Sequence, residues 1–431
     1  MIDNSFLTPS GYIPRVAESS IRRALAAAPM VLLEGAKGCG KTWAGLSMAR
    51  SKLLLDADAN DLAFARASPR DALREGPYPK LVDEYQRVPE LWNAIRGVCD
   101  EGRDPGRFVL TGSAEKVDDV TRHSGAGRLI RVRLRPMSLF ETGHSTGEVS
   151  LRSLMAGEPP PTARTVERSL RAWSEITCAG GWPRHLGMPS DAAQRLLIGY
   201  LNETVRADLP LETGVRRDPA KVMRLMRSHA RHSATIATQA SLARDTAGDG
   251  PPLGRHAASG YLDAMHRLFV LDDLDGWVPA MRSKSVLRQS PKRHMVDPSL
   301  ATAVLRAGPD QLSSDLRTLG LLFESLAIRD LRVYAEAHDM SVWHYHDDKH
   351  RELDAVIEHP DGRWMAVEVK LGGVPSALDD AAESLLTVAC QAVKNSRRGP
   401  PAAHVLLTAL GRQAYRRPDG VDVVPLSLLG P

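Results

Sequence analysis

The stretch Gly35-Ala36-Lys37-Gly38-Cys39-Gly40-Lys41-Thr42 decides the fold of the N-terminal part of this chain. It fits the pattern G-x-x-x-x-G-K-[ST], in which glycines let backbone N–H groups approach phosphate oxygens closely. The apolar run Met30–Leu33 precedes it as a predicted buried strand, and the helix-prone segment Trp43–Arg50 follows it. This strand–loop–helix context predicts that the chain binds a nucleoside triphosphate.

The residues of the loop have different expected roles. Lys41 reaches the β- and γ-phosphates, and the Thr42 hydroxyl holds Mg²⁺. Cys39 contributes mainly its backbone. We therefore expect ATP and Mg²⁺ as cofactors, bound by Gly35, Ala36, Lys37, Gly38, Cys39, Gly40, Lys41 and Thr42.

Four further strand-like runs follow the loop, with helical segments between most of them. Two of these runs end in acidic residues. Such alternation predicts a parallel α/β sheet whose ligands lie at the carboxyl ends of the strands. The runs are Leu53–Asp56, Lys80–Glu84, Phe108–Ser113 and Arg128–Leu134.

The pair Asp83-Glu84 follows an apolar pair and supplies a second acidic motif. Asp83 is predicted to hold the magnesium shell, and Glu84 to orient or deprotonate the attacking water. The alternative is an ordinary acidic turn, which the phosphate loop makes the weaker interpretation. Thr111 and Ser113 close the next strand, where a polar side chain can touch the γ-phosphate or the water. The sequence leaves open which of the two points inward.

The composition indicates a globular protein of several domains. A chain of 431 residues is expected to form about two to four domains. The formal net charge of +4 says little about partners. Four scattered cysteines without C-x-x-C spacing do not favour a disulfide frame or a zinc site. Residues 1–14 lack a signal-peptide pattern, and no apolar run is long enough to span a bilayer, so we expect a cytoplasmic protein.

The middle of the chain resembles a winged helix. Helix-prone segments at 220–232, 238–246 and 255–269 precede two short apolar runs separated by a basic stretch. Basic side chains at the tip of such a wing touch phosphates in nucleic-acid complexes. The predicted recognition helix carries few basic residues, so docking on nucleic acid and packing against protein stay equal alternatives. The basic residues of the stretch are Arg282, Lys284, Arg288, Lys292 and Arg293.

The C-terminal part resembles the PD-(D/E)xK nuclease core. A predicted helix carries Glu324, a following strand carries Asp354, and the next strand carries Glu368 and Lys370 on one face. Glu324, Asp354 and Glu368 are the expected Mg²⁺ ligands, and Lys370 would position water or stabilise charge at the scissile phosphate. The alternative is a solvated ladder of acids and lysine. A nuclease-like fold also leaves the activity itself open.

Six motifs occur in the order that is found in a large group of bacterial and archaeal AAA-type ATPases of poorly defined function. The resemblance covers nearly the whole chain. The motifs are Gly35–Thr42, Val82-Asp83-Glu84-Tyr85-Gln86-Arg87-Val88-Pro89, Val109-Leu110-Thr111-Gly112-Ser113, Gly127-Arg128, Pro136-Met137-Ser138-Leu139-Phe140-Glu141 and Gly180-Gly181-Trp182-Pro183.

The resemblance implies an α/β fold in four parts. These are a P-loop AAA-type ATPase domain over 1–150, a helical lid over 166–232, a winged-helix segment over 233–305 and a C-terminal restriction-endonuclease-like domain over 310–431. It also implies that Arg128 stabilises γ-phosphate charge, the alternative being a surface pair with an acid.

The leading hypothesis is therefore ATP-dependent action on nucleic acid, DNA or RNA, with metal-dependent cleavage as a further expectation. The rival is an ATP switch or protein-remodelling module whose C-terminal domain binds without cutting, so a protein partner is the alternative to nucleic acid. The resemblance leaves monomer, dimer and larger oligomer open.

Overall fold

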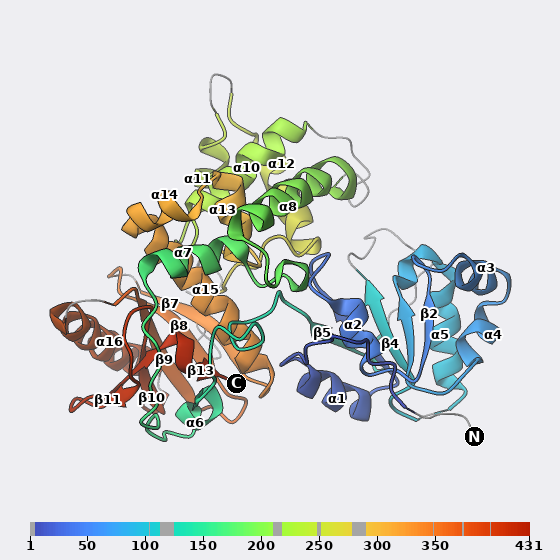
Figure 1. Ribbon diagram of the computed structural model, residues 1–431, viewed down its shortest axis with the longest axis horizontal. Helices are drawn as coiled ribbons and strands as arrows, with labels where there is room; N and C mark the ends of the chain where they lie inside the picture. Colours follow the sequence, from blue (N-terminus) through green and yellow to red (C-terminus); the bar gives the residue numbers. More distant parts are fainter. Residues whose placement is uncertain are drawn as a thin grey trace. The chain divides into compact units, whose positions relative to one another are not determined.

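The structure is a computed structural model that describes residues 5–102, 104–112, 125–209, 218–247, 251–277, 290–347, 349–372, 375–396 and 398–431 (Figure 1). The chain forms two compact units. The first comprises Met1–Pro136 with Arg267–Phe269, and the second comprises Met137–His266 with Val270–Pro431. In the described part of the chain, no helix is both long and apolar enough to cross a membrane.

The first unit contains the predicted parallel sheet. Its five strands have the order β2-β3-β4-β1-β5, and all neighbouring strands pair in parallel. β4 lies between β1 and β3, so its end adjoins both the strand before the phosphate loop and the strand that carries Asp83. The strands are β1 (Met30–Glu34), β2 (Ser51–Leu54), β3 (Lys80–Asp83), β4 (Phe108–Gly112) and β5 (Leu129–Arg133).

Helices connect these strands and bury one continuous apolar core. Leu32, Val82 and Leu110 from the strands pack with Leu91 and Ile95 of α5. Burial of this apolar area supplies most of the stability of such a layer. The helices are α1 (Glu18–Ala27), α2 (Lys41–Leu46), α3 (Ala59–Ala67), α4 (Pro69–Arg74) and α5 (Glu90–Asp100).

The second unit begins with a helical region. Between its helices, isolated antiparallel bridges join Ile236 to Lys292, Leu271 to Met295 and Leu274 to Lys292. A short extended segment thus follows α10, and two more follow α12. The helices are α6 (Leu151–Met155), α7 (Leu170–Ala179), α8 (Ser190–Glu203), α10 (Pro219–Arg231), α11 (Gln239–Arg244), α12 (Arg255–Arg267), α13 (Pro298–Leu305) and α14 (Pro309–Ser314).

A mixed sheet of six strands occupies the C-terminal part of the same unit. Its order is β11-β12-β10-β9-β8-β7, with parallel pairing of β9, β10 and β12 and antiparallel pairing elsewhere. The long helix α15 (Leu316–Glu336) precedes the sheet, and α16 (Pro375–Ser396) connects β9 to β10. The strands are β7 (Ser341–His346), β8 (Glu352–Glu358), β9 (Trp364–Lys370), β10 (Ala403–Thr408), β11 (Tyr415–Arg416) and β12 (Val421–Pro425).

The segment Met137–Glu141 packs into the second unit through main-chain and buried ionic contacts. The Leu139 N–H donates to Asp330 Oδ2 at 3.0 Å. Asp330 in turn accepts from the Arg329 guanidinium, which also donates to Asp297 at 2.7 Å. The two-stranded pairing of β6 (Val149–Ser150) with β13 (Leu429–Gly430) lies in this unit as well.

The glycines of the Gly180–Pro183 motif permit a close approach in the same unit. The Met137 N–H donates to the Gly181 carbonyl oxygen at 2.5 Å. A Cβ atom on Gly181 would lie 1.9 Å from the Met137 carbonyl oxygen, so a larger residue does not fit there. This contact brings two of the six motifs together in the fold.

Candidate functional site

The phosphate loop folds as its glycines require. Gly38 and Gly40 adopt φ angles of 78° and 101°, which glycine reaches without steric cost. Gly35 has φ 154°, and a Cβ there would lie 2.1 Å from the Leu134 carbonyl oxygen. The chain can therefore wrap tightly between β1 and α2, as a cradle for phosphate oxygens requires.

Two basic side chains hold the loop in this shape. The Lys41 ammonium donates to the carbonyl oxygens of Gly35 and Ala36 at 2.8 and 2.9 Å. The Arg15 guanidinium donates to the carbonyl oxygens of Cys39 and Arg135, both at 2.8 Å. Arg15 is buried and lies just before α1. No sequence motif pointed to it, because its partners are far away in the chain.

A hydroxyl–carboxylate cluster lies at the ends of α2, β3 and β4. Asp83 Oδ1 accepts hydrogen bonds from the Thr42 hydroxyl at 2.9 Å and from the Thr111 hydroxyl at 2.6 Å. Asp83 and Thr111 are buried. Hydroxyl and carboxylate oxygens are the ligands that Mg²⁺ prefers, so Thr42 and Asp83 fit the predicted role in holding the ion beside the phosphates. The position of Ser113 lies outside the described residues.

Glu84 is held in an unusual backbone conformation next to this cluster. Its φ of 53° and ψ of 46° place a non-glycine residue in the left-handed region. The Glu84 N–H donates to the Thr111 hydroxyl oxygen at 3.0 Å, and Gln86 Nε2 donates to Glu84 Oε2 at 2.5 Å. Strained residues of this kind persist where the surrounding structure fixes them, often at functional sites. Gln86 is a residue of the site that the sequence interpretation assigned no role.

Arg128 lies away from the phosphate loop of its own chain. Its carbonyl oxygen accepts from the N–H of Met30, the first residue of β1, whereas the loop follows the last residue of that strand. The first and last residues of this five-residue strand are roughly 13 Å apart. The Arg128 side chain forms an ion pair with Asp100 at 2.5 Å. Within one chain, this placement sets Arg128 apart from the phosphate loop and agrees with the alternative of a surface pair.

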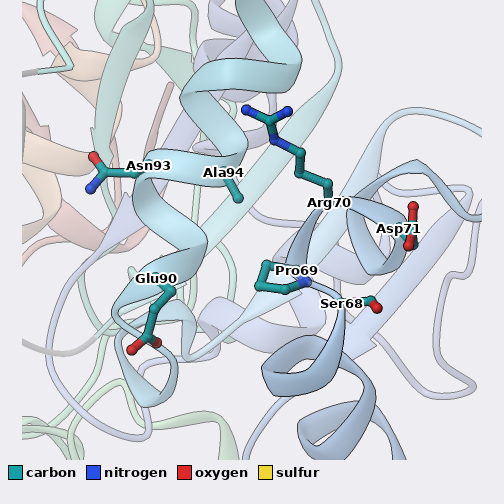
Figure 2. A pocket seen from close by; sticks show the side chains of 7 residues that line it. All are labelled: Ser68, Pro69, Arg70, Asp71, Glu90, Asn93 and Ala94. Carbon is teal, nitrogen blue, oxygen red and sulfur yellow. The ribbon is translucent and has the colours of Figure 1, made fainter.

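A hollow of about 440 Å³ lies between α4 and α5 of the first unit (Figure 2). Arg70 and Asp71 line it from α4, and Glu90, Asn93 and Ala94 line it from α5. It contains no residue of the phosphate loop. Its lining is an ordinary mixture of surface charges, and we assign no ligand to it.

The C-terminal acidic residues come together, but with an additional lysine among them. The Lys292 ammonium donates to Glu324 Oε1 at 2.5 Å and to Asp354 Oδ1 at 2.9 Å. The Lys370 ammonium donates to Glu368 Oε1 at 2.6 Å. The Lys292 side chain is 1% exposed, whereas that of Lys370 is 45% exposed. We name these five residues the lysine–carboxylate cluster.

Charges within the lysine–carboxylate cluster shift one another's protonation. Burial lowers the pKa of Lys292, but Asp354 and Glu324 outweigh burial and raise it above its usual value. Burial likewise raises the pKa of Asp354, yet Lys292 and Lys370 reverse the effect and lower it. Burial and the neighbouring Asp354 raise the pKa of Glu324 well above its usual value, and that of Glu368 to about 7. Asp354 is therefore the firmly ionised partner of Lys292.

Glu324, Asp354 and Glu368, the predicted Mg²⁺ ligands, are paired with ammonium groups in this structure. Among the residues that the structure describes, no group of three or more acidic, histidine or cysteine side chains is arranged to hold a metal ion. The physical reason is that ammonium groups already occupy the carboxylate oxygens. Lys370 lies beside Glu368, as the alternation along β9 predicts.

The predicted contacts of the wing with phosphates also need correction. Lys292 is buried in the lysine–carboxylate cluster. Arg293 is buried as well, and donates to Asp273 at 2.5 Å and to the Ala237 carbonyl oxygen at 2.9 Å. Neither side chain is available to a phosphate backbone. The remaining basic residues of that prediction, Arg282, Lys284 and Arg288, lie outside the described residues.

The geometry of the phosphate loop agrees with the comparison to known protein families. Residues 27–143 match the family model of an AAA domain. This part of the chain is thus an ATP-binding AAA-type domain, and such domains typically bind ATP with Mg²⁺. Residues 170–311 and 319–429 match two families that are each described as a domain of unknown function, DUF8612 and DUF4143.

Proteins of similar sequence occur in mycobacteria. Uncharacterized proteins of Mycobacterium bovis and Mycobacterium tuberculosis are 28% identical to this chain over 368 residues, which is 84% of the chain and 75% of each relative. A solved structure of a Walker-type ATPase from Pyrococcus abyssi aligns with a TM-score of 0.44 and 15% identity, over 71% of this chain and 100% of that one.

Proposed function

We propose that the chain hydrolyses ATP at the phosphate loop. The observation that carries this proposal is the joint contact of Asp83 with the hydroxyls of Thr42 and Thr111, with Glu84 fixed beside it. A site that only bound nucleotide would have no need of a second carboxylate held in a strained conformation next to the first. Hydrolysis needs one group to hold the ion and another to act on water.

Each residue of the site has a distinct part in this mechanism. Lys41 exchanges its contacts with the loop carbonyl oxygens for contacts with phosphate oxygens and so neutralises charge. Thr42 and Asp83 would hold Mg²⁺, which supplies positive charge at the phosphates when bound. Glu84 orients the attacking water and accepts its proton, while Gln86 holds the Glu84 carboxylate through its amide.

Phosphate release from ATP tests this proposal. The Lys41→Ala variant is expected to lose nucleotide binding, and with it phosphate release, because it removes the ammonium that holds the loop and would neutralise phosphate charge. Lys80→Met serves as a control, since it removes another buried lysine of the same unit without touching the loop. Unchanged phosphate release by Lys41→Ala would contradict the assignment of the site.

We further propose that ATP hydrolysis acts as a switch for a C-terminal domain that binds nucleic acid. The order α15, β7, β8, β9, α16, β10 supports a nuclease-like fold for this domain. The helices α10, α11 and α12, together with the bridges at Ile236, Leu271 and Leu274, support a winged helix before it. Both folds are common in proteins that act on nucleic acid, although neither fixes a function by itself.

Binding without cutting is the interpretation that the lysine–carboxylate cluster favours for this domain. Gel retardation of DNA and RNA at low salt, with and without ATP, tests the binding. Retardation that changes with ATP supports the switch. If neither nucleic acid is retarded, a protein is the partner and the winged helix is a packing element. Mass measurement with and without ATP then decides between monomer and oligomer.

A further inference from the structure

The lysine–carboxylate cluster joins residues that are remote in the sequence. Lys292 follows α12 and pairs through its backbone with Leu274, with N···O distances of 2.9 and 2.8 Å. Its side chain reaches Glu324 on α15 and Asp354 on β8. The segment that matches DUF8612, residues 170–311, therefore supplies the Lys292 ammonium. The segment that matches DUF4143, residues 319–429, supplies the carboxylates that it contacts.

Every carboxylate of the cluster already has a donor within the chain. Asp354 Oδ1 accepts from Lys292, and its Oδ2 accepts from the Val369 N–H at 2.9 Å. Glu324 accepts from Lys292, and Glu368 accepts from Lys370. Buried carboxylates that are paired with ammonium groups in this way form a stable arrangement, because loss of the partner leaves an uncompensated buried charge.

A divalent ion and the Lys292 ammonium cannot share this position. The ammonium nitrogen lies 2.5 Å from one carboxylate oxygen and 2.9 Å from the other. Mg²⁺ would sit about 2.0–2.1 Å from the same oxygens, and so would overlap with the nitrogen. Like charges at such a distance in a buried site also repel strongly. The side chain has to leave before a metal can enter.

We propose that the Lys292 ammonium takes the place of a divalent cation in the nuclease-like domain, so that the preceding segment keeps this domain free of metal and unable to cut. Nothing in this inference depends on ATP hydrolysis. It rests on the proposed nuclease-like fold in one respect, namely that the carboxylates of such a fold would otherwise hold a metal ion. The cluster instead ties the two segments of the second unit together through a buried ionic contact.

The test is metal binding by the full chain without nucleotide, with Mn²⁺ as the probe. Thermal unfolding and electron paramagnetic resonance report stabilisation and the amount of bound ion. Lys292→Met leaves Glu324 and Asp354 without their cation, so Mn²⁺ is expected to raise its melting temperature and to bind at about one further equivalent per chain. The double variant Lys292→Met/Asp354→Asn is expected to lose this gain.

Lys80→Met is the matched control. Lys80 is as deeply buried as Lys292, but its ammonium donates to the Glu75 carbonyl oxygen at 2.7 Å and not to a carboxylate. Its variant keeps Asp83, so any binding of Mn²⁺ at the phosphate loop appears equally in both proteins. We expect Lys80→Met to be destabilised and to lack the further equivalent of Mn²⁺ that Lys292→Met binds.

Two results would overturn the inference. One is a folded Lys292→Met variant that binds no more Mn²⁺ than the unmutated protein. The other needs no Lys292 variant and so covers the case in which that variant fails to fold. If the unmutated protein binds Mn²⁺ and Asp354→Asn removes that binding, the metal ion displaces the Lys292 ammonium from the cluster. Failure of ATP hydrolysis leaves both of these measurements unaffected, so the two proposals fail separately.

Discussion

Replacement of Arg329 by methionine is expected to destabilise the second unit strongly. The guanidinium donates to Asp297 at 2.7 Å and to Asp330 at 2.6 and 2.9 Å. Only 3% of the Arg329 side chain is exposed, and neither aspartate side chain is exposed at all. Removing one partner from a buried ionic network leaves uncompensated charge and costs about 3–5 kcal/mol. Methionine keeps most of the side-chain volume, so the loss reports charge and hydrogen bonding.

Urea unfolding followed by tryptophan fluorescence measures this effect, because Trp173 and Trp182 are buried in the same unit. Arg171→Met is the control. Arg171 pairs with Glu175 at 2.9 Å and with Asp310, but these side chains are about half exposed or more, and each such pair contributes at most about 1 kcal/mol. A midpoint shift for Arg329→Met no larger than that for Arg171→Met would refute the argument that the network of Arg329 is a buried, compensated one.

Three further predictions address the loop, its surroundings and the pH dependence of stability. Gly35→Ala places a Cβ 2.1 Å from the Leu134 carbonyl oxygen, so ATP affinity is expected to fall about tenfold or more. Unchanged affinity in a calorimetric titration would be evidence against the observed conformation of the phosphate loop. Arg128→Ala is expected to leave the rate of ATP hydrolysis by a monomeric chain unchanged, because the Arg128 side chain pairs with Asp100. A large loss of rate in a phosphate-release assay would show that Arg128 acts in the active site. Burial, with Lys292, lowers the pKa of His344 to about 3, so the folded chain takes up no proton there while the unfolded chain does as pH falls through 6.5. Protonation of this residue in the unfolded chain therefore lowers the free energy of unfolding by about 2 kcal/mol between pH 7.5 and 5. Urea unfolding of His344→Gln is expected to show a loss of stability over this pH range that is smaller by that amount. An equal loss in both proteins would contradict the lowered pKa of His344.

Local sequence patterns predicted most of the elements that position the nucleotide. The five strands of the first sheet lie within a few residues of their predicted bounds, because each is a short apolar run with a clear end. The predicted helix that carries Glu324 begins at Leu316. Asp315 caps it by accepting from the Thr318 N–H at 3.1 Å.

Contacts between remote residues could not be predicted in the same way. Lys292 belongs to a basic stretch, and such stretches usually lie on the surface, yet its partners are 32 and 62 residues further along the chain. Arg128 illustrates the same limit, since its distance from the phosphate loop depends on the parallel register of β5 with β1. A pattern of charges in sequence does not report which end of a strand a residue occupies.

The motif around Gly180 and Gly181 shows what a pattern can and cannot convey. In the sequence it was only one of the six motifs of the family resemblance and had no assigned structural role. The structure supplies the partner, because Gly181 contacts Met137 through its carbonyl oxygen and Asp297 through its N–H. The same aspartate accepts from Arg329, so the motif belongs to the buried network and not to the nucleotide site.

The most direct test of the account is a comparison of ATP binding with ATP hydrolysis in Glu84→Gln. The amide keeps the size of the side chain and its distance from Gln86, but it cannot accept a proton from water. Binding of ATP is expected to stay close to that of the unmutated protein, while phosphate release falls by at least about a hundredfold. Phosphate release at the unmutated rate, with binding intact, would contradict the assignment of Glu84 and with it the proposed hydrolytic site.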